Sequence, residues 1–175
     1  MTSPLLTAIK GPSVREPYAW AITRGWKLVE NRTWPTRFRG PVLIHAGLRE
    51  ERDDVDSVIR LVARQTGMDP RIVEQDYRQH RHLGAIVGAA TITDCVEDLD
   101  NDWFYGPHGF VLADAVACQP VPCRGALSFF AVPPEGLAII IGVDRLLDMA
   151  RTTLNVAADV VTAVIVDERE GGAQR

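Results

Sequence analysis

Cysteine is scarce in this sequence, and its spacing does not suggest a metal site or a disulfide. The chain of 175 residues contains 3 cysteines, Cys95, Cys118 and Cys123, and no CxxC pair. An odd number without a paired spacing argues against a disulfide framework and against zinc. We therefore expect reduced cysteines that act as small apolar side chains, and we predict no metal and no other cofactor.

Long apolar runs are also missing. No stretch of the sequence approaches the roughly 20 apolar residues that a membrane-spanning helix needs. The N-terminal sequence MTSPLLTAIKG lacks the apolar core that is typical of a signal peptide. We therefore expect no membrane partner, and the default prediction is a cytoplasmic protein.

The chain has no overall positive charge. Its formal net charge is −4, so it lacks the basic field that attracts nucleic acid non-specifically. Any contact with nucleic acid must therefore use a local patch. A basic cluster near the N-terminus offers such a patch, although a solvated loop would look the same: Arg24, Lys27, Arg32, Arg37 and Arg39.

What remains is an ordinary globular composition, with 46% hydrophobic and 24% charged residues. This length is enough for one domain with a real core. The prolines at 133 and 134 end the apparent domain, so we predict a domain over residues 1–133. Residues 134–175 are predicted to be an extension that packs on the domain or on a second copy, with a disordered end.

Hydrophobic periodicity and turn residues predict an alternation of short strands and helices. Asp69 followed by Pro70 is a typical helix start, and Gly67 is a typical helix end. The predicted strands cover residues 5–9, 27–34, 41–46, 84–95, 110–117 and 126–132, with breaks at 10–13 and 119–122, and the helices start at Pro17, at 49 (to 66) and at Pro70.

The stretch from Pro17 to His45 concentrates the chemistry of the chain. A short predicted helix ends at Gly25, and three charged residues follow: Lys27, Glu30 and Arg32. In a regular strand Glu30 and Arg32 would share one face, whereas Lys27 would lie on the other. Lys27 joins them only if it belongs to the turn or if a bulge redirects it.

The segment from Gly25 to Arg32 fits the pattern G-x-K-x-x-E-x-R and resembles the signature of ASCH domains. The flanking segments EPYAWAI before it and RGPVLIHA after it are similar to the bacterial and phage branch of that family. So are GAIVG at 84–88 and the pair Asp94-Cys95. The likeness covers about residues 6–132.

This resemblance implies an α+β fold of the PUA-like superfamily. That fold is a small, highly curved β-barrel, here of about six strands, with helices packed outside. It also implies a cleft between the barrel and the first helix, lined by the signature residues. The recurring partner in this superfamily is RNA or a modified nucleoside. One ASCH branch removes the acetyl group from N4-acetylcytidine, and another member type is reported as a ribonuclease.

We predict that binding uses charged, aromatic and polar side chains of the cleft. Basic groups would contact phosphates, a tryptophan would stack on a base, and a carboxylate or amide would contact a base edge. A lone histidine such as His45 is more often structural. The candidate binding residues are Trp26, Lys27, Glu30, Asn31, Arg32, Trp34, Arg37, Arg39, His45 and Asp94.

Catalysis is the main alternative to simple binding. In amide hydrolysis Lys27 would be base or nucleophile, Glu30 would relay protons, and Arg32 would stabilise an oxyanion. The deacetylating branch carries threonine where this chain has Glu30, and a neighbouring glutamate tends to keep a lysine protonated. A ribonuclease is also open.

Two further interpretations remain open. The three charged residues could be a plain ion-pair network that anchors the helix to the barrel. Residues 134–175 could form an interaction module and a homodimer interface.

Overall fold

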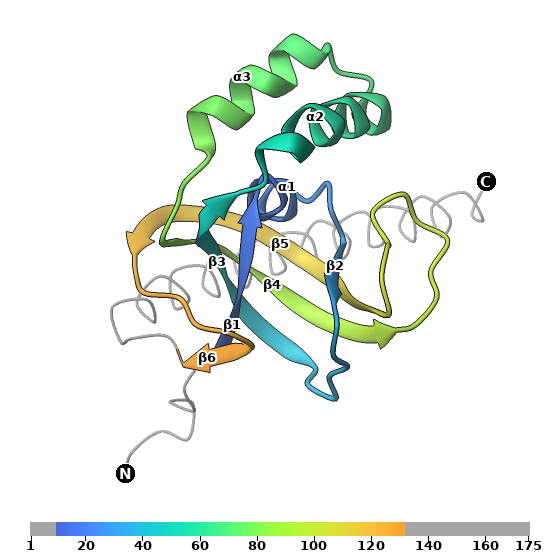
Figure 1. Ribbon diagram of the computed structural model, residues 1–175, viewed down its shortest axis with the longest axis vertical. Coiled ribbons are helices and arrows are strands. Elements are labelled where there is room, and N and C mark those ends of the chain that lie inside the picture. The colour runs from blue at the N-terminus through green and yellow to red at the C-terminus, as the bar shows by residue number, and fades with distance from the viewer. Residues whose placement is uncertain (1–9, 132–175) are drawn as a thin grey trace, which may run out of the picture. The chain divides into compact units, whose positions relative to one another are not determined.

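A computed structural model describes residues 10–131 of the protein. The described part begins with a strand and a short helix, and two longer helices follow the third strand (Figure 1). The elements are β1 (Lys10–Glu16), α1 (Tyr18–Thr23), β2 (Val29–Arg32), β3 (Gly40–Glu50), α2 (Arg52–Thr66), α3 (Pro70–His80), β4 (Ala85–Val96), β5 (His108–Pro122) and β6 (Phe129–Ala131).

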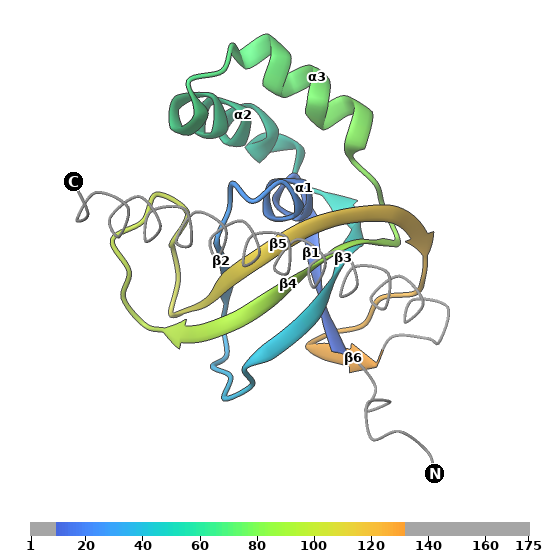
Figure 2. The same cartoon turned by 180° about the vertical axis from the view of Figure 1, so that it is seen from behind.

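The strands form one sheet with the order β2-β5-β4-β3-β1-β6. The pair β1–β3 is parallel, and the other neighbouring pairs are antiparallel. Figures 1 and 2 show that the long strands β3, β4 and β5 curl, so that the sheet forms half of a small barrel. The predicted α+β class, with a curved PUA-like barrel of six strands, is confirmed.

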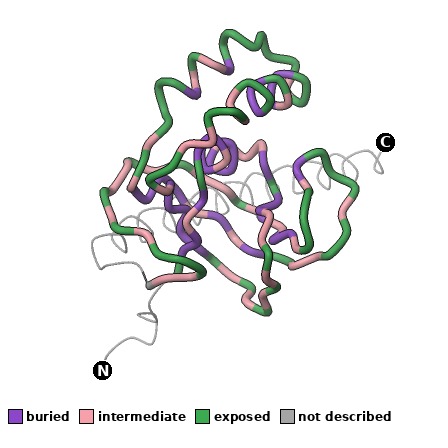
Figure 3. Tube along the Cα trace, viewed as in Figure 1, coloured by how far each residue is buried: buried purple, intermediate pink, exposed green. Residues whose placement is uncertain are grey.

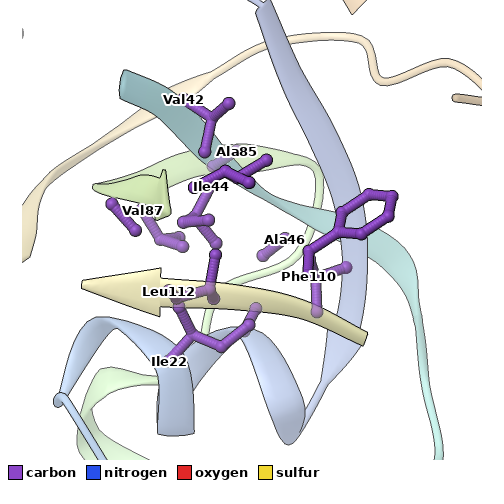
Figure 4. Packing of buried hydrophobic residues seen from close by; sticks show 12 residues of the cluster. Ile22, Val42, Ile44, Ala46, Ala85, Val87, Phe110 and Leu112 are labelled. Carbon is purple, nitrogen blue, oxygen red and sulfur yellow. The ribbon is translucent and has the colours of Figure 1, made fainter. Parts of the chain in front are cut away.

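Helix α1 is the most deeply buried helix of the described chain. Its residues from Ala19 to Ile22 are at most 2% exposed, and Figure 3 shows it as buried beside the more exposed α2 and α3. Ile22 reaches toward Leu112 of β5 in the core (Figure 4). Burial of such aliphatic side chains contributes roughly 1.5–3 kcal/mol each.

Helices α2 and α3 pack over the other side of α1, around Trp20. The Trp20 ring contacts the Tyr77 ring edge-on, and its Nε1 donates to Asp76 at 2.8 Å. Arg24 donates to both oxygens of the same carboxylate, at 3.0 and 2.7 Å, which ties the end of α1 to α3. None of the described helices combines the length and the apolar character that crossing a membrane would require.

All three predicted helices are present, but the helix predicted over 49–66 starts later, at Arg52, because residues 49–50 belong to β3. At the start of α3, Asp69 accepts a hydrogen bond from the Arg71 N–H at 2.7 Å. Gly67 takes the left-handed conformation (φ 73°) after α2. The strand predicted over 27–34 is shorter at both ends: residues 27–28 still belong to the connection after α1, and residues 33–34 form a bend. The strand predicted over 5–9 and the extension 134–175 lie outside the described residues.

The two predicted breaks were wrong. Residues 10–13 belong to β1, where Gly11 lies so close to the Leu43 carbonyl that a side chain would collide with it. This glycine therefore marks a close approach of two strands rather than a turn. Residues 119–122 belong to β5, whose register shifts between Val121 and Ala117 and so accommodates Pro120 in an irregular stretch.

Gly88 of β4 sets how closely α1 approaches the sheet. A Cβ atom at this position would lie 2.6 Å from Cγ2 of Thr23 and closer still to the carbonyl oxygen of Val116. The backbone atom is fixed in β5, so it cannot move aside as a flexible side chain could. The position of α1, and with it the start of the following charged segment, depends on this glycine.

We expect Gly88→Ala to lower the free energy of unfolding by about 1–3 kcal/mol, because the new methyl group overpacks the α1–β4 contact. Chemical denaturation monitored by circular dichroism measures the change. Gly47→Ala is the matched control, since a Cβ there makes only an ordinary contact of 3.5 Å with the Val14 carbonyl. Equal stability of the two variants would contradict this role of Gly88.

Candidate functional site

The turn after α1 determines where the charged segment begins. Gly25 adopts φ 73°, a conformation that favours glycine. The backbone N–H groups of Trp26 and Lys27 both donate to the Ala21 carbonyl, at 3.0 and 3.1 Å. Lys27 is therefore held in the turn and not in β2, which begins at Val29. This placement removes the strand-face conflict that regular alternation would create.

The three signature charges form one chain of ion pairs. Lys27 Nζ lies 2.9 Å from Glu30 Oε2, and Arg32 Nη2 lies 3.0 Å from Glu30 Oε1. Each oxygen of the Glu30 carboxylate thus has its own cationic partner. The exposed fractions of the side chains are 1%, 10% and 18% for Lys27, Glu30 and Arg32.

Lys27 is the most buried of the three. Its ammonium also donates to the Val29 carbonyl and lies 5.6 Å from the centre of the Tyr18 ring. Burial lowers the pKa of Lys27, and the adjacent Glu30 carboxylate opposes that shift. A buried ammonium is tolerated because its donors are used by a carbonyl, a carboxylate and an aromatic face.

A pocket of about 790 Å³ opens beside the carboxylate and the guanidinium. Lys27 does not line it, so the lysine lies beneath the floor and not in the pocket itself. The lining comes from β1, α1, β2, the start of α2 and three loops: Ser13, Val14, Arg15, Tyr18, Glu30, Asn31, Arg32, Thr33, Trp34, Glu51, Asp54, Tyr105, Gly106, Pro107, Leu127 and Ser128.

Arg32 connects the pocket floor to β1. Its Nη2 donates to the Ser13 carbonyl at 2.8 Å. Its Nε is buried and has no hydrogen-bond partner among residues 10–131. The guanidinium has five N–H donors, so these contacts leave it unsaturated. A carbonyl or phosphate oxygen in the pocket would meet a guanidinium whose position is already fixed.

Aromatic side chains form the walls. The rings of Tyr18 and Tyr105 are 6.4 Å apart and tilted, and Tyr105 is 56% exposed. The Tyr18 hydroxyl donates to Asp54 of α2 at 2.8 Å, and burial raises the pKa of Tyr18. Trp34 packs edge-on against Phe110 and Phe129 and also lines the pocket.

The predicted site residues divide into those at the pocket and those elsewhere. Asn31 lines the pocket, but its amide is already used: it donates to the Trp103 carbonyl at 2.8 Å and accepts from the Tyr105 N–H at 2.9 Å. Trp26 packs edge-on against Trp20, 5.0 Å away, and does not line the pocket.

The remaining predicted residues lie outside the pocket. Buried His45 lies between the Ser13 hydroxyl (3.1 Å) and the Cys123 carbonyl (2.9 Å), and burial lowers its pKa. Exposed Arg39 pairs with Asp94 at 2.7 Å. A hydrogen bond from the Cys95 N–H, with Arg39 next in importance, lowers the pKa of Asp94. Arg37 is exposed and does not line the pocket.

Sequence reasoning missed several side chains of the pocket. Tyr18 and Asp54 lie outside the G-x-K-x-x-E-x-R pattern, so they were not among the predicted site residues. Tyr105 belongs to an aromatic group at a glycine turn, which was an available signal. Among residues 10–131, no group of three or more metal-ligating side chains lies close enough to hold a metal ion.

A second buried carboxylate, Glu16, supports the site from below. It is 1% exposed and accepts from the backbone N–H groups of Trp20 (3.0 Å) and His82 (3.3 Å). It thereby joins the start of α1 to the connection between α3 and β4. Burial raises the pKa of Glu16 to about 7, against the two hydrogen bonds, which lower it.

Comparison with known families gives two matches to different parts of the chain. The family model of the ASCH domain matches residues 13–110, from within β1 to the start of β5, and so includes the charged segment and most of the pocket lining. The model of the sodium:dicarboxylate symporter family matches residues 124–169. Only residues 124–131 of that second match belong to the described part of the protein.

The curated relatives match only a short stretch of this chain, about as long as the match to the symporter family. The proton/sodium-glutamate symport protein of Bacillus subtilis (strain 168) is 49% identical over 45 residues, which is 26% of this chain and 10% of that protein. The proton/glutamate-aspartate symporter of Escherichia coli (strain K12) is 48% identical over 44 residues. This chain thus spans about a tenth of the length of these relatives.

Stability should depend on the protonation of Glu16. Its pKa is about 7 in the folded protein against an ordinary 4.5, so protonation favours folding. The contribution, about 3 kcal/mol, is fully present below pH 4.5 and is lost as the pH rises through about 7.

Denaturant unfolding of the wild type and Glu16→Gln across this pH range measures that contribution. The stability of the wild type relative to the variant should fall as the pH rises, because the glutamine does not titrate. A constant difference between the two proteins would show that Glu16 has an ordinary pKa.

Proposed function

This chain belongs to the ASCH domain family, and we propose that it binds an RNA segment or a modified pyrimidine nucleoside in the pocket beside Glu30 and Arg32. The observation that carries this proposal is the pocket itself. A carboxylate and a guanidinium, fixed by each other and by a buried lysine, lie on the floor of a cavity with aromatic walls. Membership of the family favours an RNA-related role.

The floor suits the edge of a pyrimidine. A carboxylate has about four lone-pair sites, so Glu30 can accept from an exocyclic amine while it keeps its two ion pairs. Arg32 can donate to the neighbouring carbonyl oxygen of the same base. Because both groups are already paired and oriented, little side-chain freedom is lost when a base arrives.

The walls suit the flat face of a base. Tyr105 is half exposed and Trp34 is braced by two phenylalanines, so either ring can present a face. A base stacked on one aromatic ring contributes roughly 1–3 kcal/mol. Trp26 is less suited to this role, because its ring packs against Trp20.

The other predicted residues have supporting parts in this proposal. Lys27 holds the Glu30 carboxylate in position from below the floor. Asn31 holds the Tyr105 backbone, and His45 supports β1 through Ser13. Arg37 and Arg39 would act at a distance, by attracting phosphates.

Single substitutions in the floor and in the wall of the pocket should each weaken ligand binding. We expect Glu30→Gln and Tyr105→Ala each to raise the dissociation constant for the preferred RNA or nucleoside about tenfold, because one base contact is lost. Titration calorimetry with a panel of short RNAs and modified nucleosides measures the effect.

The controls remove similar groups away from the pocket. Asp56→Asn on α2 removes an exposed carboxylate, and Ile72→Ala on α3 removes an apolar side chain that is 55% exposed. Thermal melts establish that each variant is folded. Folded Glu30→Gln and Tyr105→Ala variants that keep wild-type affinity for every ligand would refute the proposed site.

Hydrolysis is the second candidate, and the lowered pKa of Lys27 favours it. Glu30 lies between Lys27 and the pocket, so it could pass a proton from a bound water or substrate to the lysine. Arg32 would stabilise the oxyanion that forms when the acyl carbonyl of N4-acetylcytidine is attacked. A ribonuclease would need a general base at the pocket, and the buried His45 does not line it.

If the protein is a hydrolase, purified protein should release acetate from N4-acetylcytidine, and Lys27→Arg should abolish that release. Arginine keeps the positive charge beside Glu30 but cannot accept a proton near neutral pH. Lys27→Met gives a second test if the larger side chain is not accommodated. Acetate release that survives in a folded variant would exclude Lys27 as the base.

The weaker alternative is a protein-interaction module. It assigns a homodimer interface to residues 134–175, which lie outside the described part of the chain. That interface therefore stays a prediction.

A further inference from the structure

A second depression, of about 550 Å³, adjoins the first pocket where β3 ends and α2 begins. Its lining consists of four arginines, two glutamates and two exposed leucines. The lining residues are Arg15, Leu48, Arg49, Glu50, Glu51, Arg52, Arg81 and Leu83. Four guanidinium groups minus two carboxylates leave a local charge of about +2, on a chain whose net charge is −4.

Both carboxylates of this depression already have partners. Glu50, with a side chain only 14% exposed, accepts from the Tyr77 hydroxyl and from Arg81 (2.7 Å), and lies 3.5 Å from Arg52. Glu51 forms an ion pair with Arg15. The carboxylates therefore hold the guanidinium groups in place, and they do not neutralise the excess of positive charge.

Two of the arginines remain available to an anion. Arg49 is exposed and forms no ion pair with any residue of the described range. The Arg52 side chain is 87% exposed, and its contact with Glu50 is long. An arginine presents a planar set of donors that matches two oxygens of a phosphate.

The depression and the first pocket share Arg15 and Glu51 as lining residues. The ion pair between these two side chains therefore forms the boundary between the two spaces. A base on the floor at Glu30 carries its sugar and phosphates outward from the pocket. An RNA strand that continues past Arg15 and Glu51 would enter the arginine-rich depression.

We propose that the depression around Arg49 and Arg52 binds the phosphate backbone of the same ligand whose base occupies the first pocket. This inference rests on the proposed function and deepens it. The ligand class is then a single-stranded RNA and not a free nucleoside, because only a strand reaches both spaces. Leu48 and Leu83 provide apolar surface against which a ribose or the next base can pack.

The double variant Arg49→Ala/Arg52→Ala tests this proposal. Its affinity for a labelled short single-stranded RNA of mixed sequence should fall about tenfold or more, because phosphate contacts are lost. Each lost contact should also lower the slope of affinity against salt concentration by about one. Its affinity for cytidine and N4-acetylcytidine should stay at the wild-type value. Fluorescence anisotropy over a series of salt concentrations measures the RNA arm, and calorimetry measures the nucleoside arm.

The matched control is Arg60→Ala/Arg71→Ala, which removes two exposed arginines from α2 and α3 that line neither space. Equal RNA affinity and salt slope for the two double variants would overturn the proposal. So would a parallel loss of nucleoside affinity in Arg49→Ala/Arg52→Ala. Failure of the proposed function has a different signature, namely RNA affinity that depends on Arg49 and Arg52 but not on Glu30→Gln.

Discussion

The Glu30 carboxylate, held between Lys27 and Arg32, is the interaction on which the site depends. Each of its oxygens neutralises one cation, so three largely buried charges coexist where any one alone would be costly. The cations come from different places, one from the turn after α1 and one from β2. The pair of contacts therefore fixes helix, turn and strand together. Arg32 extends this fixation to β1 through the Ser13 carbonyl.

Local signals in the sequence were enough for the helices and for most of the sheet. The caps at Asp69 and Gly67 act within a few residues, so α2 and α3 could be predicted from the chain alone. Gly11 and Pro120 misled the prediction, because the features that keep them in strands are distant. Gly11 lacks a side chain and so allows β3 to pack closely, and the irregular pairing of β5 with β4 accommodates Pro120. Turn-forming residues do not reveal such partners.

The site was predictable in its floor and less so in its walls. The spacing of Lys27, Glu30 and Arg32 is local, and the resemblance to ASCH domains added the cleft. Tyr18 and Tyr105 come from segments far apart in sequence, and their rings meet only in the folded chain. Trp26 was predicted to bind the ligand, and it packs against the core instead. A tryptophan beside a charged motif is as useful to the core as to a ligand, and here it packs on Trp20.

The side chain of Asn31 has a consequence for how a ligand would enter. Its amide spans the gap between β2 and the loop before β5, and it bonds backbone groups at Trp103 and Tyr105. Loops of this kind usually sample many arrangements, and a partner must then select one of them. With the loop tethered to a strand, Tyr105 is anchored before any encounter. A ligand of this pocket would therefore meet a wall that is already in place, and its binding would not require this loop to close.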